Sequence, residues 1–174
     1  MTGNAYKPIL VELNAELKDE FLAMAKDYEA AGEAVYQFGQ EDDFDAFLER
    51  LEMSRTGKNL PAGGVRANTF FLLVDGKFAG MGFLRHALNE KLAVYGGHIG
   101  YDVSPSERQK GYGSLILRLT LEKAREIGLE RVFLTCDADH LASSKIIEKN
   151  GGRLENQMFY EPTGKLISQY WIEL

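Results

Sequence analysis

The chain contains a single cysteine, Cys136, among 174 residues, so it cannot form an internal disulfide. A sequence of this kind suits a reducing compartment, and we expect a cytoplasmic protein. Histidine is also scarce, because only His86, His98 and His140 are present. These three lack the short spacings to cysteine, histidine or aspartate that are typical of a zinc site. The sequence therefore predicts neither a disulfide framework nor a bound metal.

Long apolar runs and an excess of positive charge are missing too. No run approaches the length of a membrane span, and the first residues, with Glu12 and Glu16, do not resemble a secretory signal. The formal net charge is −6, whereas domains that follow nucleic-acid phosphates are usually basic. We therefore expect no membrane and no nucleic acid as a partner, and any positive patch must be local.

The residues that are present suit one compact domain over residues 1–174, because 45% of them are hydrophobic. Apolar periodicity and turn residues predict an α/β or α+β fold with a mixed sheet and helices. Strands are expected over residues 8–13, 69–74, 78–85, 97–103, 131–136, 154–159 and 166–173. Helices are expected over residues 17–31, 41–54, 114–127 and 142–149, with a loop over 57–67 and a tight hairpin turn at Asp75-Gly76.

Residues 98–113 carry the clearest chemical signal, because an apolar strand runs into a basic, glycine-rich turn that opens a helix. Arg108 and Lys110 supply positive charge, and Gly111 and Gly113 leave room for backbone N–H groups to converge on anionic oxygens. The turn lacks the lysine and hydroxyl ending of a nucleotide phosphate loop and the third glycine of a dinucleotide fingerprint. The local chemistry therefore favours a pyrophosphate ligand, with a solvated turn that needs positive φ as the alternative.

The stretch Arg108-Gln109-Lys110-Gly111-Tyr112-Gly113 resembles the signature Arg/Gln-x-x-Gly-x-Gly/Ala of the GNAT superfamily of acyl-CoA-dependent N-acyltransferases. Residues 135–152 resemble that family's second segment, a strand and a helix that end on Glu-Lys-x-Gly. The resemblance covers roughly residues 68–174. It implies a mixed, mostly antiparallel sheet that is splayed between its fourth and fifth strands and flanked by helices.

The resemblance also implies how acetyl-CoA binds. Pantetheine would add to the open edge of the fourth strand, with Val103 as its main backbone partner. The diphosphate would rest on N–H groups at the helix start, where the helix dipole favours negative charge. His140 stands where the family commonly has an asparagine, and Ser143 could instead be a helix cap. The expected cofactor-binding residues are Tyr101, Asp102, Val103, Arg108, Gln109, Lys110, Gly111, Tyr112, Gly113, Ser114, His140 and Ser143.

Acyl transfer to an amine needs a base that takes the amine proton. Some relatives place a glutamate where Gly97 stands here, so this chain lacks that carboxylate. His98 is adjacent and has a reference pKa near neutrality, although a strand histidine satisfied by a neighbour is the simpler interpretation. Glu90 is the second candidate base, with a solvated surface carboxylate as its alternative.

The group that protonates the leaving thiolate is equally open. Many relatives have a tyrosine at the position of Ile147, close to the sulfur of CoA. A hydroxyl of Tyr101, Tyr112 or Tyr160 could replace it, or the thiolate could leave without specific protonation. Cys136 could in principle form an acyl-enzyme, but no paired base is evident and lone strand cysteines are usually inert.

The resemblance thus predicts an N-acetyltransferase that moves an acetyl group from acetyl-CoA to a primary amine by direct transfer in a ternary complex. An acidic protein suits a cationic acceptor, which would be an amine-bearing small molecule, an amino acid or a peptide N-terminus. Two alternatives remain: a catalytically weak acyl-CoA-binding sensor or regulatory module, and a nucleotide-binding regulator. The oligomeric state is open, with a homodimer as one option.

Overall fold

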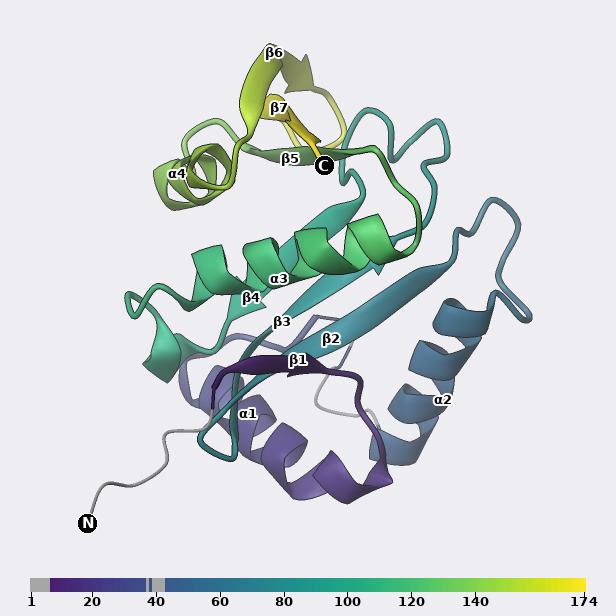
Figure 1. The fold of residues 1–174 in the computed structure, drawn as a ribbon, viewed down its shortest axis with the longest axis vertical. Helices are drawn as coiled ribbons and strands as arrows, with labels where there is room; N and C mark the ends of the chain where they lie inside the picture. Colours follow the sequence, from purple (N-terminus) through teal and green to yellow (C-terminus); the bar gives the residue numbers. More distant parts are fainter. Residues whose placement is uncertain (1–6, 37, 39–42) are drawn as a thin grey trace.

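The computed structural model describes residues 7–36, 38 and 43–174, which form two antiparallel sheets and the helices around them (Figure 1). The first sheet comprises β1 (Ile9–Val11), β2 (Ala67–Val74), β3 (Lys77–Arg85) and β4 (Ile99–Val103), paired in that order. The second comprises β5 (Arg131–Asp137), β6 (Arg153–Tyr160) and β7 (Lys165–Glu173), with β7 in the centre. The helices are α1 (Lys18–Ala30), α2 (Phe44–Thr56), α3 (Tyr112–Glu126) and α4 (Leu141–Lys149), with short 3₁₀ turns at Ala15–Leu17 and Pro105–Glu107.

The first sheet separates two layers of helices, and the alternation of side chains along β2 shows how. Phe71 packs against α1 and α2, in one buried cluster with Phe21, Met24 and Phe47. Its neighbours Phe70 and Leu72 point to the opposite face and pack against residues of α3. Successive strand residues point to opposite faces, so one strand supplies both cores.

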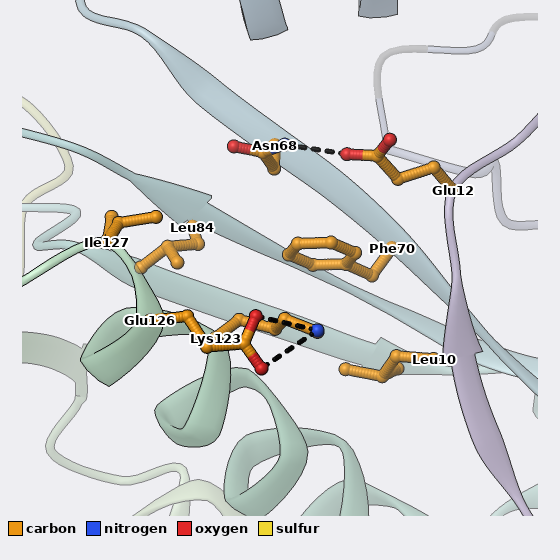
Figure 2. A pocket seen from close by; sticks show the side chains of 8 residues that line it. All are labelled: Leu10, Glu12, Asn68, Phe70, Leu84, Lys123, Glu126 and Ile127. Carbon is orange, nitrogen blue, oxygen red and sulfur yellow. Dashed lines mark hydrogen bonds and ion pairs between the residues drawn. The ribbon is translucent and has the colours of Figure 1, made fainter.

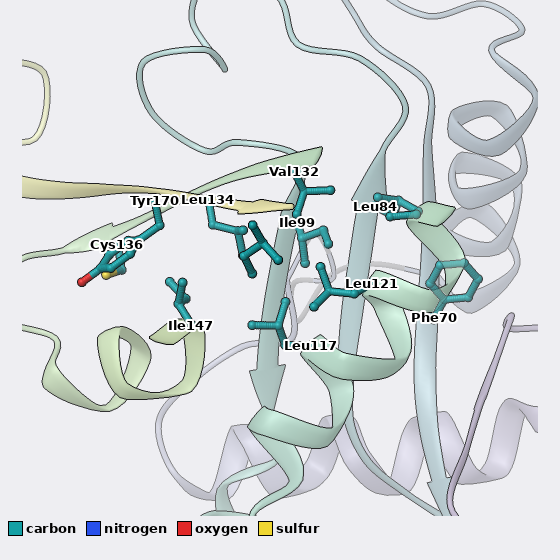
Figure 3. Packing of buried hydrophobic residues seen from close by; sticks show 12 residues of the cluster. Phe70, Leu84, Ile99, Leu117, Leu121, Val132, Leu134, Cys136, Ile147 and Tyr170 are labelled. Carbon is teal, nitrogen blue, oxygen red and sulfur yellow. The ribbon is translucent and has the colours of Figure 1, made fainter. Parts of the chain in front are cut away.

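The sheet is split between β4 and β5, as the family resemblance implied. No described strand pairs with β5 on that side by a regular ladder. At the junction of the two sheets, the backbone N–H of His98 donates to the carbonyl of Phe133 at 2.7 Å, and the N–H of Phe133 donates to Nδ1 of His98 at 2.9 Å. Below that junction, the buried cluster of Figure 3 holds α3 and α4 against β5 and β7, through Leu117, Leu134 and Ile147. Beyond the cluster, the edge of β4 is left open.

Each predicted strand and helix has a counterpart, with boundaries that differ by a few residues. Asp75 and Gly76 both have positive φ, 47° and 77°, and form the predicted tight turn between β2 and β3. The helix predicted over residues 41–54 is α2, which begins after its cap Asp43, and residues 41 and 42 lie outside the described part. The last residue of the helix predicted over 114–127, Ile127, is the C-cap of α3 and is 41% exposed.

Candidate functional site

A pocket of about 560 Å³ lies where the end of β4, the turn into α3 and the helix α4 come together. Every residue of the predicted cofactor set except Lys110 lines it. The lining residues are Tyr101, Asp102, Val103, Arg108, Gln109, Gly111, Tyr112, Gly113, Ser114, His140, Ala142, Ser143, Lys145, Ile146 and Lys149. Segments that are far apart in the sequence therefore meet at the open edge of β4, which the split between the sheets exposes.

The turn between β4 and α3 brings the start of the helix to this pocket. Gln109 and Gly111 have positive φ, 64° and 85°, which turns the chain sharply into the helix. Gly111 is the N-cap of α3, and no side chain caps the helix there. A Cβ at Gly111 would meet nothing within 4 Å, so the space in front of the helix start is open. An uncapped helix start with open space before it suits an anionic ligand.

Positive charge reaches the pocket from α4, which the sequence reasoning did not assign. Lys145 and Lys149 both line the pocket. Their spacing of four residues places them on one face of a helix. This spacing is the sequence signal from which the two lysines could have been predicted to lie together. Lys110 instead pairs with Glu107 at 2.9 Å and is not among the lining residues.

Arg108 lines the pocket, but its guanidinium is engaged elsewhere in the protein. Its two Nη atoms donate to the carboxylate of Glu33 at 2.8 and 2.6 Å, and its Nε donates to the carbonyl of Val103 at 3.2 Å. The hydrogen bonds to Glu33 raise the pKa of Arg108. The expectation of a free charge beside a diphosphate is therefore not met in this state, because Glu33 already neutralises Arg108.

The other polar group of Val103 is engaged as well. Its N–H donates to Oδ1 of the preceding Asp102 at 2.8 Å. Burial raises the pKa of the Asp102 carboxyl, and the hydrogen bond from Val103 opposes that rise. Both backbone groups of Val103 thus have partners within the chain, and a ligand that adds to this strand edge must replace them.

Tyr101 points from β4 towards the start of α4. Its hydroxyl lies 2.9 Å from Oγ of Ser143 and donates to the Ser143 carbonyl at 3.3 Å. Burial raises the pKa of Tyr101 to about 12, with the Ser143 hydrogen bond acting in the opposite direction. Cys136 lies close by, 3.5 Å from Oγ of Ser144, and burial raises the pKa of its thiol. The phenol and the thiol are therefore both protonated at neutral pH.

His98 lies at the junction of the two sheets and is 8% exposed. Its Nδ1 accepts the backbone N–H of Phe133 at 2.9 Å. A backbone amide can only donate, so the neutral ring carries its proton on Nε2. Burial lowers the pKa of His98, although the Phe133 hydrogen bond acts to raise it. The His98 ring therefore links the two sheets, and its unprotonated nitrogen, Nδ1, already accepts a hydrogen bond.

The remaining residues that the sequence singled out, the candidate base Glu90, the cofactor residue His140 and Ile147, lie in different places. Glu90 is exposed in the loop between β3 and β4, and His140 is exposed just before α4. Ile147, at the position where many relatives have a tyrosine, is 1% exposed, packs in the core with Leu117 and Leu134, and does not line the pocket. Its neighbour Ile146 lines the pocket instead.

A second hollow, of about 290 Å³, lies between the first sheet and the end of α3 (Figure 2). Its polar side chains bond to one another. Lys123 pairs with Glu126 at 2.8 Å, and Asn68 donates to Glu12 at 2.6 Å. None of the predicted site residues lines it. We therefore take the pocket at the open edge of β4 as the candidate active site.

Within the described part of the chain, no helix is both long and apolar enough to cross a membrane. Likewise, no described group of three or more histidine, cysteine, aspartate or glutamate residues is arranged to hold a metal ion.

A split sheet with an uncapped, glycine-bearing helix start beside it defines a class of enzyme, and comparison with known proteins identifies it. The model of the acetyltransferase (GNAT) family matches residues 21–151. This match covers more than half of the chain, which therefore belongs to that family and is an N-acetyltransferase dependent on acetyl-CoA. Among curated proteins, none matches significantly.

Solved structures share the fold. An acetyltransferase from Salmonella typhimurium that modifies the N-terminal serine of ribosomal protein L7/L12 has a TM-score of 0.70 at 15% identity, over 98% of this chain and 96% of its own. Mycobacterium smegmatis RimJ, solved with CoA-disulfide, also has 0.70 at 15% identity, over 95% and 81%. The microcin C7 self-immunity acetyltransferase MccE, solved with acetyl-CoA and AMP, has 0.68 at 13% identity, over 97% and 93%.

Proposed function

We propose that the chain acts as one domain that transfers an acetyl group from acetyl-CoA directly to a primary amine within a ternary complex, in the cytoplasm. The observation that carries the proposal is the uncapped start of α3 at Gly111, which lines the same pocket as Lys145 and Lys149. Backbone N–H groups at a helix start and two ammonium groups suit a diphosphate.

The pocket residues fit CoA in a further respect. Pantetheine carries amide groups, and the polar groups of Val103 face the open side of β4. Binding there would replace Asp102 and Arg108 as hydrogen-bond partners of Val103. The donor supplies the acetyl group as a thioester, whose carbon–sulfur bond breaks as the carbon–nitrogen bond forms. One proton leaves the amine and one is taken up by the sulfur.

Tyr101 is the candidate donor to the leaving sulfur, because its hydroxyl lies in the pocket beside Ser143. Moving a proton from a phenol of pKa about 12 to a thiolate with a reference pKa of about 8.5 costs ~5 kcal/mol. The phenol therefore suits donation of a hydrogen bond better than complete proton transfer. For the amine proton, Glu90 and His98 are the candidates, and His98 would first have to release the N–H of Phe133 from its Nδ1. The single variants Glu90→Ala and His98→Ala test them by the ascending limb of the pH–rate profile.

The experiment that tests the proposal is CoA titration of Gly111→Asp. An aspartate side chain would enter the open space before α3, and its charge would repel the diphosphate, so we expect CoA binding to be nearly lost. Gly63→Asp is the matched control, since Gly63 also has a positive φ, 75°, and open space around it but does not line the pocket. Unchanged CoA affinity in folded Gly111→Asp would overturn the assignment of the site.

The activity is tested separately, by thiol release from acetyl-CoA across a panel of amines. Release that depends on the amine, with an acetylated product of the expected mass, supports direct transfer. Tight CoA binding without amine-dependent release would favour an acyl-CoA sensor, a reading supported by the missing carboxylate at Gly97 and the missing tyrosine at Ile147.

A further inference from the structure

Arg85 differs from the arginines that the structure places in ion pairs. It lies at the end of β3, and its Nη1 donates to the carbonyls of Gly96 and Gly97 at 3.3 and 2.8 Å. Its guanidinium also lies over the ring of Phe83, with Cζ 4.6 Å from the ring centre. By contrast, Arg55, Arg108 and Arg118 each pair with a glutamate.

The partners described for Arg85 are all neutral. Within the described part of the chain, no carboxylate forms an ion pair with it. Burial lowers its pKa from the usual value, and the hydroxyl of Tyr36 opposes that shift. A half-buried cation that has carbonyls and rings but no anion around it is costly unless a ligand brings the anion.

The surroundings of Arg85 are aromatic and reach the solvent. Tyr36, from the segment between α1 and α2, stacks on Phe83 with ring centres 4.9 Å apart and planes 13° apart. Tyr36 is 43% exposed. A Cβ at Gly100 would lie 2.1 Å from the Phe83 ring, so this ring covers β4 directly.

The stack lies on the far face of β4 from Tyr101, because Gly100 and Tyr101 are neighbours in a strand and point to opposite faces. Tyr101 lines the proposed acetyl-CoA pocket, whereas Phe83 and Arg85 belong to the face that α1 and α2 cover. The open edge of β4 joins the two faces. An acceptor held by Arg85 on one face would reach a thioester on the other face across this edge.

We propose that Arg85 binds a carboxylate of the acceptor, and that the acceptor is a small amine bearing a carboxylate, with free α-amino acids as the simplest class. This inference rests on the proposed acetyl transfer. A guanidinium binds a carboxylate through two parallel N–H donors, and the rings of Tyr36 and Phe83 would contact the apolar part of the acceptor. A peptide N-terminus lacks the adjacent carboxylate and would bind poorly.

The test compares free amino acids with their α-amides and with short peptides that begin with the same residue. Thiol release from acetyl-CoA gives kcat/KM for each, and mass spectrometry identifies the product. We expect the wild-type protein to favour at least one free amino acid over its amide. In Arg85→Gln the acid-to-amide ratio should fall by about tenfold to a hundredfold, as expected for loss of a charged hydrogen bond.

Variants separate binding of the carboxylate from support of the loop. A loosened Gly96–Gly97 segment would lower the rates for acid and amide together and leave their ratio unchanged. Arg85→Lys keeps the charge without the planar guanidinium, so its acid-to-amide ratio should lie between those of the wild type and Arg85→Gln. If Arg85→Gln does not fold, Arg85→Lys takes its place in the test. Arg55→Gln, which removes a surface arginine paired with Glu52, should leave the ratio as in the wild type.

Equal use of acid and amide by the wild-type protein, or an unchanged ratio in folded Arg85→Gln, would overturn the inference. If only amines without a carboxylate are acetylated, the proposed function stands and the inference fails. If no amine in either group is acetylated, the inference fails as well, and CoA titration then shows whether the donor site has failed with it.

Discussion

Replacement of Gly97 by alanine should strain the junction between the two sheets, where His98 and Phe133 are hydrogen-bonded. Gly97 has a φ of +65°, and a Cβ there would lie 2.3 Å from the carbonyl oxygen of Phe133 and 3.0 Å from Cα of Leu134. Both are backbone atoms of β5, so no side-chain rotation can relieve the clash. Either β5 moves away from His98, or the backbone at residue 97 changes its conformation.

The expected cost follows from a matched position in the same chain. Gly164 has the same φ of +65°, but a Cβ there would meet nothing within 4 Å. Gly164→Ala should therefore cost only the left-handed strain of a residue with a Cβ, about 1–2 kcal/mol. Gly97→Ala should cost that strain and, in addition, about 1–3 kcal/mol for the steric clash.

Urea denaturation followed by tryptophan fluorescence measures both variants with one probe. The only tryptophan, Trp171, lies in β7 with its ring centre 5.1 Å from that of Phe133, so it reports on the strand that must move. We expect Gly97→Ala to lose clearly more unfolding free energy than Gly164→Ala. An equal loss of unfolding free energy in the two variants would refute the steric argument. It would show that the cost is only the left-handed backbone strain that both variants share.

Three further outcomes follow from the site. Glu33→Gln should tighten CoA binding at low salt, because it releases Arg108 and removes a negative charge, and a titration that shows no change would count against that coupling. Tyr101→Phe should lower turnover by roughly tenfold without removing a limb of the pH–rate profile, since a phenol of pKa about 12 stays protonated. Burial lowers the pKa of His98 below its ordinary value of 6.5, so the stability it contributes is complete above 6.5 and is lost as the pH falls through the lower folded value. Unfolding curves at about pH 8 and pH 5 should therefore differ less in His98→Gln than in the wild type, while His86, also lowered by burial, acts equally in both.

The strand and helix order was predictable because each element carries its own local signal. Asp75-Gly76 marks a turn with two positive φ values, and Gly111 marks the start of α3. The backbone part of the site was accessible for the same reason, since residues 101–103 and 109–114 are adjacent in the sequence.

The partners of the charged side chains at the site could not be predicted from the neighbouring sequence. Arg108 and Glu33 are far apart in the chain, and only the packed fold shows that Glu33 neutralises the arginine. The motif drew attention to Ile147, but neighbouring residues of a helix point in different directions. In α4 the side chain of Ile147 packs in the core, and that of Ile146 lines the pocket. Arg85 carried no motif, and its lack of an anionic partner appears only once the neighbouring strands are in place.

The central place of β7 has a consequence for the order in which the protein can be made. β5 and β6 each pair only with β7 among the described strands, and β7 is the last of the three to be synthesised. Until it emerges from the ribosome, β5 has no ladder and α4 has no sheet to cover, although β1 to β4 and α3 are already available to fold. The pocket is lined both from the start of α3 and from α4, and α4 has its place only after β7 is made. A chain interrupted before Lys165 would therefore hold no complete binding site.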